Sequence, residues 1–262
     1  MHPLLNIAVR AARRAGSIIV RSINQLDSIK VDSKGRNDFV SEVDRAAEQD
    51  IIDTVRRAYP DHAFLAEESG ETGKSDTVWI IDPLDGTTNF LHGFPVFAVS
   101  IAVREKGLLT HGVIYDPMRQ ELFTASRGAG AQLDGRRIRV SARRSLDQAL
   151  IGTGLPFLGK TADLDRYLPM LRFVIEHTAG VRRPGAASLD LAYVAAGRLD
   201  GFWELGLKPW DMAAGALMIV EAGGIVADVN GGDRFLDTGE ILAGSPKVFE
   251  ALRRALPKVP AG

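Results

Sequence analysis

The stretch WIIDPLDGTTNF, which spans Trp79–Phe90, decides how the chain is interpreted. Its apolar start predicts a buried strand, which runs into Asp82 and, three positions later, into Asp85. The Asp-Pro-Leu-Asp sequence favours a turn, because Asp suits the first position of a turn and Pro presets the backbone of the second. We therefore predict that the strand ends in a turn that folds both carboxylates toward one point.

Two carboxylates at one point suit a hard divalent cation. In proteins, Mg²⁺ is commonly held by a few carboxylates together with waters and substrate phosphate. The next residues, Thr87–Leu91, are bounded by Gly93 and Pro95, which predicts a brief helix whose free N–H groups face the acids and attract phosphate. The plainer alternative is that Asp82 and Asp85 only shape a turn and cap this helix.

Acids also stand at the ends of two other apolar segments. LAEESGE places Glu67 and Glu68 after an apolar run, and KPWDMAAGALMIVEAGG places Asp211 directly before an apolar helix. Taken alone, Glu67 and Glu68 indicate solvent-exposed charges, and Asp211 indicates a helix cap. Together with the first stretch, three strand or helix ends carry carboxylates, and the sequence offers no competing catalytic set.

The composition excludes several other kinds of protein. The 262 residues are 45% hydrophobic and 25% charged, which suits one large domain or two closely packed ones. A net charge of -1 gives no basic excess for nucleic acid or an anionic membrane, and no apolar run is long enough to cross a bilayer. The absence of cysteine excludes thiolate chemistry and agrees with the cytoplasmic location that we expect.

Apolar spacing predicts a mixed α/β fold in two halves. Two amphipathic helices, near 4–19 and 43–58, are expected before any strand, and short β-rich runs from His62 predict a meander-like sheet that these helices cover. In the second half, alternating strands and helices predict α/β layering. No linker separates the halves, 1–140 and 141–262, so we expect them to share an interface.

The acidic motifs together resemble those of the inositol monophosphatase family, among the lithium-sensitive, magnesium-dependent sugar phosphatases. DPLDGTTNF and WDMAAGALMIVEAGG are similar to its two signatures, LAEES to its Glu-Glu metal motif, and DFVSEVD to the segment that supplies an auxiliary aspartate. The likeness runs from the first helix to about Pro246, and is greatest to bacterial inositol-1-monophosphatases. It implies a layered α-β-α-β-α sugar-phosphatase fold, lithium sensitivity and a homodimer.

The resemblance also implies a site for two to three Mg²⁺ ions. Glu67, Asp82 and the backbone carbonyl of Leu84 would hold one ion. Asp82, Asp85 and Asp211 would hold a second, so that Asp82 bridges the two, and a weaker third ion is expected near Glu67. These assignments agree with the chemistry of the acidic stretches, because a metal pair can activate water and stabilise both the entering and the leaving oxygen.

Catalytic roles follow from the same resemblance. Gly86 and Thr87 would give backbone N–H groups to phosphate, and the Thr87 hydroxyl, hydrogen-bonded to Asp44, would help to deprotonate the attacking water beside Glu67. From the pattern alone, Asp44 completes a capping box with Ser41. The two roles of Asp44 are compatible.

Further residues would contact the substrate. Glu204 matches an acid that accepts hydrogen bonds from inositol hydroxyls, although the pattern alone makes it an ordinary strand-end charge. The segment RRPGAAS matches a Gly-Ser/Thr-Ala stretch, but Ala186 replaces the hydroxyl residue and Ser188 appears two positions later. The complete set of predicted substrate contacts is Asp85, Gly86, Thr87, Gly185, Ala186, Ala187, Glu204 and Asp211.

The leading hypothesis is hydrolysis of myo-inositol monophosphate and related polyol phosphates. Alternatives within the superfamily are phosphatases for fructose 1,6-bisphosphate, histidinol phosphate or 3′-phosphoadenosine 5′-phosphate, and Glu204 together with the lack of a second basic pocket favours a neutral polyol. A different class of function is an adaptor, since bacterial relatives are associated with transcription antitermination factors and RNA polymerase. The sequence gives this role little direct support, since an arginine cluster is more often solvated surface than a docking site. The cluster consists of Arg136, Arg137, Arg139, Arg143 and Arg144.

Overall fold

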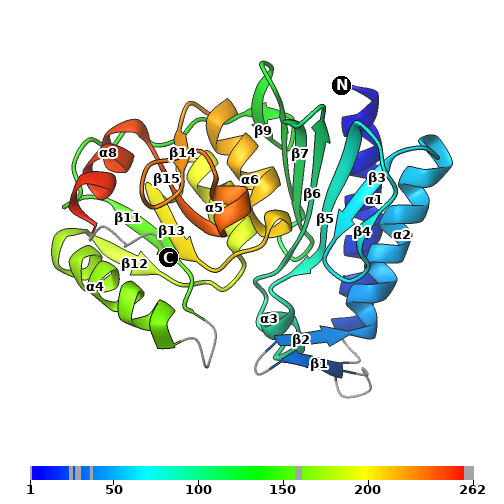
Figure 1. Cartoon of the computed structure of the whole chain (residues 1–262), viewed down its shortest axis with the longest axis horizontal. Helices are drawn as coiled ribbons and strands as arrows, with labels where there is room; N and C mark the ends of the chain where they lie inside the picture. The colour runs from blue at the N-terminus through cyan, green and yellow to red at the C-terminus, as the bar shows by residue number, and fades with distance from the viewer. Residues whose placement is uncertain (1, 24–25, 27–30, 36–37, 157–160, 257–262) are drawn as a thin grey trace.

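The chain folds into five alternating layers of helix and sheet (Figure 1). The structure, a computed structural model, describes residues 2–23, 26, 31–35, 38–156 and 161–256. In order, the layers are the helices α1 and α2, an eight-stranded sheet, α5 and α6, a five-stranded sheet, and the helices α4 and α8. The helix bounds are α1 (Pro3–Ser22), α2 (Glu42–Ala58), α4 (Thr161–His177), α5 (Ala187–Ala195), α6 (Pro209–Glu221) and α8 (Pro246–Ala255). The predicted α-β-α-β-α architecture is confirmed.

The larger sheet has the order β10-β9-β8-β7-β6-β5-β3-β4. Its neighbours are antiparallel except for β3 and β5, which are parallel, so the predicted meander is confirmed from β5 to β9, and β10 extends it. Its strands are β3 (Ala63–Ala66), β4 (Gly70–Thr72), β5 (Thr77–Asp85), β6 (Ala98–Glu105), β7 (Leu108–Asp116), β8 (Glu121–Ser126), β9 (Gly130–Leu133) and β10 (Arg136–Arg137).

The smaller sheet has the order β12-β11-β13-β15-β14. Its first three strands are parallel and the remaining pairs are antiparallel, as expected where helices alternate with strands. The strands are β11 (Leu150–Thr153), β12 (Gly180–Arg182), β13 (Gly201–Leu205), β14 (Ile225–Ala227) and β15 (Glu240–Gly244), and the short helix α7 (Phe235–Thr238) precedes β15.

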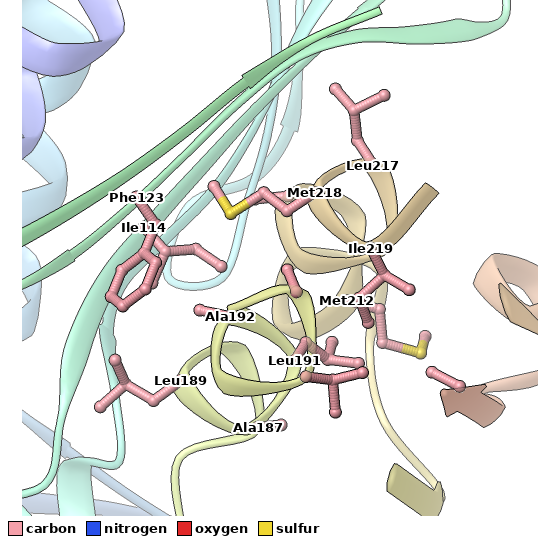
Figure 2. Packing of buried hydrophobic residues seen from close by; sticks show 14 of the residues in the cluster. Ile114, Phe123, Ala187, Leu189, Leu191, Ala192, Met212, Leu217, Met218 and Ile219 are labelled. Carbon is pink, nitrogen blue, oxygen red and sulfur yellow. The ribbon is translucent and has the colours of Figure 1, made fainter. Parts of the chain in front are cut away.

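Strand β5 separates two hydrophobic cores. Ile80 belongs to the core beneath α5 and α6, whereas Trp79 and Ile81 belong to the core beneath α1 and α2. This alternation is that of a pleated strand buried on both faces. Figure 2 shows the first core, where side chains of the large sheet pack against the two central helices. The labelled residues of this core include Ile114, Phe123, Leu189, Ala192 and Met218.

The segment between α1 and α2 contains an unexpected hairpin. Strands β1 (Val31–Gly35) and β2 (Asp38–Ser41) pair in antiparallel fashion, so the prediction that two helices precede any strand is wrong. The polar, glycine-containing sequence has no apolar alternation to indicate strands. The hairpin packs beside α3 (Thr87–Leu91), below the large sheet in Figure 1.

None of the helices in the described residues combines the length and the apolar character needed to span a membrane.

Candidate metal centre

Strand β5 carries both acids of the opening stretch through a β-bulge, not a turn. Asp82 pairs with Ser100 and Asp85 with Ala98, so three steps along β5 match two along β6. In a regular strand, residues three apart lie on opposite faces, but one extra residue restores the same face. The predicted turn is therefore wrong. The strand continues to Asp85 because the bulge accommodates Pro83, which has no N–H to donate to the ladder.

Glu67 meets Asp82 because two parallel strands end together. Ala66 on β3 pairs with Ile81 on β5, and the Glu67 backbone N–H donates to the Ile81 carbonyl at 3.1 Å. The next residues, Glu67 and Asp82, therefore lie side by side, and their carboxyl groups are in hydrogen-bonding contact. The pairing unites acids from two of the three predicted stretches.

The loop after β3 is held by a buried acid on α2. Both carboxylate oxygens of Glu48 accept backbone N–H groups at 2.8 Å, one from Glu68 and one from Ser69. Sequence analysis did not single out Glu48, because an acid in the polar register of a helix carries no local sign of a partner twenty residues away. Its bonds fix the direction in which the chain leaves Glu67.

Asp211 joins the acids from the start of α6. Its carboxylate accepts the Lys208 backbone N–H at 2.7 Å, which confirms the capping role, and it is also in hydrogen-bonding contact with Asp82. The Ser100 hydroxyl donates to the Trp210 carbonyl at 3.1 Å and ties this helix start to β6. Asp211 thus caps α6 and also adds a carboxyl group from a third secondary-structure element to the cluster.

Burial, and for Asp82 and Asp211 also neighbouring charges, raise the pKa of the three clustered aspartates. Burial raises the pKa of Asp82 well above its usual range, and the charges of Glu67, Asp85 and Asp211 add to the rise. Burial also raises the pKa of Asp85 to about 6, while burial and the charge of Asp85 raise that of Asp211 to about 7. Among the described residues, no ion pair reaches these three aspartates. A bound cation would remove this repulsion.

The donor set suits Mg²⁺. Every available ligand is a carboxylate or carbonyl oxygen, with neither cysteine nor an imidazole close to the cluster, and this favours a hard cation over zinc. Across the described ranges, no three acidic or histidine side chains enclose an ion by themselves. Mg²⁺ does not require a complete cage of side chains, because it keeps several waters and also binds substrate phosphate.

Helix α3 begins directly after the bulge, as predicted. Gly86 precedes it with a φ of 92°, and a Cβ there would lie 2.9 Å from a backbone oxygen, so only glycine fits. The Thr87 hydroxyl lies 2.9 Å from Asp44 Oδ1 and 3.0 Å from the Leu84 carbonyl oxygen. The predicted contact between Thr87 and Asp44 is therefore present.

Asp44 performs the capping role at the same time. Its Oδ2 accepts the Ser41 backbone N–H at 2.9 Å and also the Ser41 hydroxyl, while the Ser41 Oγ lies 3.2 Å from the Val43 nitrogen. Because the cap uses Oδ2, the other oxygen is left to Thr87. Burial raises the pKa of Asp44, so the carboxyl group accepts a proton more readily than an exposed aspartate.

A hydroxyl at the start of α5 holds Asp85. The backbone N–H and the Oγ of Ser188 lie 2.7 Å and 2.5 Å from Asp85 Oδ2. The Asn89 side chain donates to the Pro184 carbonyl at 2.9 Å and lies 3.3 Å from that of Gly185. Sequence analysis noted Ser188 only as a displaced hydroxyl, because no local signal marks a partner 103 positions away.

The substrate-side residues lie around the same acids. Ala186 is only 1% exposed and its side chain packs in the core beneath α5 and α6, so a contact with substrate there would have to use the backbone. The Ala187 N–H is hydrogen-bonded to Asp85. Glu204 on β13 is half-buried, and burial followed by the charges of Asp211 and Asp85 raises its pKa well above the usual range. Glu204 is therefore a neighbour of the carboxylate cluster.

A five-layered fold with oxygen ligands gathered at the ends of β3 and β5 and at the start of α6 is the arrangement of a metal-dependent phosphatase. The model of the inositol monophosphatase family matches residues 1–260, and the chain belongs to this family. The resemblance seen in the sequence motifs is confirmed.

Relatives cover nearly the whole chain. Nus factor SuhB of Pseudomonas aeruginosa is 60% identical over 257 residues, which are 96% of this chain and 95% of that protein. The crystal structure of extragenic suppressor protein suhB from Bartonella henselae is 49% identical, with a TM-score of 0.95 over 98% of this chain and 99% of that one. The inositol monophosphatase from Anabaena is 38% identical, with a TM-score of 0.85 over 98% and 96%.

The repulsion makes the stability of the metal-free protein depend on pH. In the folded chain Asp85 and Asp211 ionise near pH 6 and pH 7, whereas an unfolded aspartate ionises near pH 3.8. A pKa that is raised on folding stabilises the fold at low pH, and this contribution is lost as the pH rises through the folded value. We expect the melting temperature in EDTA to fall as the pH rises from about 4 to about 7 and then to level off, and Mg²⁺ to restore it at pH values above about 7.

The matched control is Asp211→Asn, which removes one charge from the cluster. Its melting temperature in EDTA should fall less over the same range, and Mg²⁺ should raise it less. Equal stabilisation of both proteins by Mg²⁺ would contradict the assignment of Asp211 to the cation site.

Proposed function

We propose that the chain is a Mg²⁺-dependent phosphomonoesterase that hydrolyses myo-inositol monophosphate to inositol and phosphate. The observation that carries this is the meeting of Asp82, Asp85 and Asp211, with Glu67 beside them, as partly or fully buried acids, where burial and neighbouring charges raise the pKa of the aspartates. Such crowding is costly without a cation. Membership of the inositol monophosphatase family supports phosphatase activity.

We assign two to three ions to these residues on the resemblance to the family. Glu67, Asp82 and the Leu84 carbonyl would hold one Mg²⁺, and Asp82, Asp85 and Asp211 would hold a second, with a weaker third ion near Glu67. The Leu84 oxygen already accepts the Thr87 hydroxyl at 3.0 Å, but a carbonyl has a second lone pair for a cation. When bound, the ions would lower the pKa of a coordinated water and stabilise the negative charge on the entering and leaving oxygens.

Thr87 and Asp44 would handle the proton of the attacking water. The Thr87 hydroxyl has one hydrogen, which Asp44 or the Leu84 carbonyl accepts, so its oxygen can in turn accept a hydrogen bond from water. As the water loses its proton to Thr87, the Thr87 proton passes to Asp44. The raised pKa of Asp44 suits this role, and Glu67 is the second nearby base.

The substrate would lie between the two halves of the chain. The backbone N–H groups of Gly86 and Thr87, with the segment Gly185–Ala187, would bind phosphate, and Glu204 would accept hydrogen bonds from polyol hydroxyls. The position of Glu204 beside Asp85 and Asp211 supports this assignment, because it places an acceptor close to the leaving group. The related bisphosphate, histidinol phosphate and nucleotide substrates remain the enzymatic alternatives that a substrate panel separates.

Asp82→Asn should reduce magnesium-dependent turnover of inositol 1-phosphate to background while the protein stays folded. Asp82 is the proposed bridging ligand, and an amide leaves both cations poorly compensated. The measurement is phosphate release against Mg²⁺ concentration, with circular dichroism to check the fold. Asp237→Asn on the exposed helix α7 is the control and should behave as wild type. Substantial turnover by folded Asp82→Asn would refute the two-metal assignment.

Thr87→Ala should lower kcat more than it changes KM. The backbone N–H contacts to phosphate survive the substitution, and only the hydroxyl that orients water is lost. Steady-state kinetics at saturating Mg²⁺ measure the two constants separately. Thr87→Ser keeps a hydroxyl and should recover much of the rate. A rise in KM at unchanged kcat would mean that Thr87 serves substrate binding alone.

An adaptor role is a second proposal for this chain. The name Nus factor belongs to the Pseudomonas aeruginosa relative, and this supports binding of antitermination factors or RNA polymerase by the present chain. The exposed residues Arg136, Arg137, Arg139 and Arg144 are the candidate surface. Co-purification should persist in Asp82→Asn and weaken in Arg136→Ala/Arg137→Ala, and loss in Asp82→Asn alone would argue against a separate adaptor surface.

A homodimer is also part of what the family resemblance implies. Light scattering measures the mass in solution and would test this oligomeric state.

A further inference from the structure

Gly154 lies directly against the carboxylate of Glu204. Strands β11 and β13 are parallel and pair Thr153 with Trp203, so the residues that follow, Gly154 and Glu204, come out side by side. A Cβ built on Gly154 would lie 1.8 Å from Glu204 Oε1 and 1.9 Å from its Cδ. Gly154 is not among the residues with positive φ, so the glycine is needed for space and not for backbone conformation.

The backbone around this contact is fixed from both strands. The Thr153 Oγ1 lies 3.1 Å from the Tyr167 hydroxyl oxygen, and the Tyr167 ring stacks on that of Trp203 with centroids 5.8 Å apart and an interplanar angle of 20°. These contacts, within a fully buried cluster, oppose separation of the strand ends. The Glu204 side chain is therefore the part that would yield to a larger residue at position 154.

The Glu204 carboxylate accepts no hydrogen bond from the described part of the chain, although the residue is half-buried. A half-buried carboxylate without a donor incurs a desolvation cost unless a ligand supplies one. Its position beside Asp85 and Asp211 therefore suits a ligand that brings hydroxyl donors. Such a ligand could reach the Glu204 carboxylate only while this group lies against the backbone of Gly154, where there is no side chain.

We propose that Gly154 is a positioning residue that sets polyol specificity by allowing Glu204 to occupy this place. This inference rests on the proposed phosphatase function. A methyl group at position 154 would force the carboxylate to retreat by roughly 1.5 Å to reach ordinary contact distance. Hydrogen bonds span only a few tenths of an ångström about their optimum, so the contact with a substrate hydroxyl would be lost. The fold would be kept, because the end of a flexible side chain moves.

The experiment compares wild type, Gly154→Ala, Glu204→Ala and the double variant on inositol 1-phosphate and on p-nitrophenyl phosphate, which has no polyol hydroxyls. Gly154→Ala should lose kcat/KM on inositol 1-phosphate by a factor on the order of 10 to 100, as should Glu204→Ala. On p-nitrophenyl phosphate the loss should stay within about twofold. In the Glu204→Ala background, Gly154→Ala should cause no further loss, because the two changes act through one carboxylate.

Thr153→Val is the matched control. It removes the hydrogen bond to Tyr167 and disturbs the same strand end without filling the space at Gly154, so it should lower the melting temperature without changing the ratio of the two substrates. A crystal structure of Gly154→Ala supplies a readout other than activity and should show a displaced Glu204 carboxylate.

Three results would overturn the role of Gly154. They are an equal loss on both substrates, a loss that persists in the Glu204→Ala background, and a Gly154→Ala structure in which Glu204 has not moved. Failure of the proposed function is a separate result: wild type would turn over neither substrate, or Glu204→Ala would treat both as wild type does. The structure of Gly154→Ala still decides in that case whether residue 154 positions Glu204.

Discussion

Electrostatic repulsion among buried carboxyl groups is the constraint on which the rest of this structure depends. Asp82 lies in contact with Glu67 and Asp211, and burial together with the charges of Glu67, Asp85 and Asp211 makes its ionisation harder. Backbone donors hold the acids in place: the Leu84 N–H bonds Asp82 at 3.0 Å, and the Lys208 N–H bonds Asp211. The fold thus uses hydrogen bonds to keep charges together that would separate in water.

The acids come from sequence segments that only the layered fold unites. Parallel pairing of β3 and β5 supplies Glu67 and Asp82, while the helices packed between the two sheets supply Asp211 and the Ser188 hydroxyl (Figure 1). The core beneath α5 and α6 includes residues of both sheets, so packing in one half fixes the acids of the other. Site geometry and core packing are therefore not independent, and a core substitution in α5 or α6 would be felt at the cluster.

Sequence predicted the parts of the molecule whose signal is local. Apolar spacing indicated α1, α2 and the strands from β5 to β9, and the short helix after Gly86 was placed at its observed residues. The proposed contact between Thr87 and Asp44 came from family resemblance and not from spacing. The turn at Asp82 was wrong because Asp-Pro preferences describe an isolated segment, whereas a bulge depends on the partner strand β6. The roles of Ser188 and Gly154 were out of reach, since each is defined by an acid at least fifty positions away.

The bulge in β5 also makes the spacing of the two aspartates a matter of parity. In a regular strand, residues an odd number of steps apart face opposite sides. The extra residue of the bulge lets three steps along β5 match two along β6, so Asp82 and Asp85 face the same side. Loss of a single residue between Asp82 and Asp85 would leave the two carboxylates two steps apart, and regular pairing with β6 would still hold both on one face. If the present three steps paired regularly with three residues of β6, one carboxylate would instead turn into the apolar core shared with α1 and α2, where Trp79, Ile81 and Leu84 now pack. The shared face of the two acids therefore depends on the bulge itself, and Pro83, which has no N–H to donate, disfavours the regular pairing that would separate them.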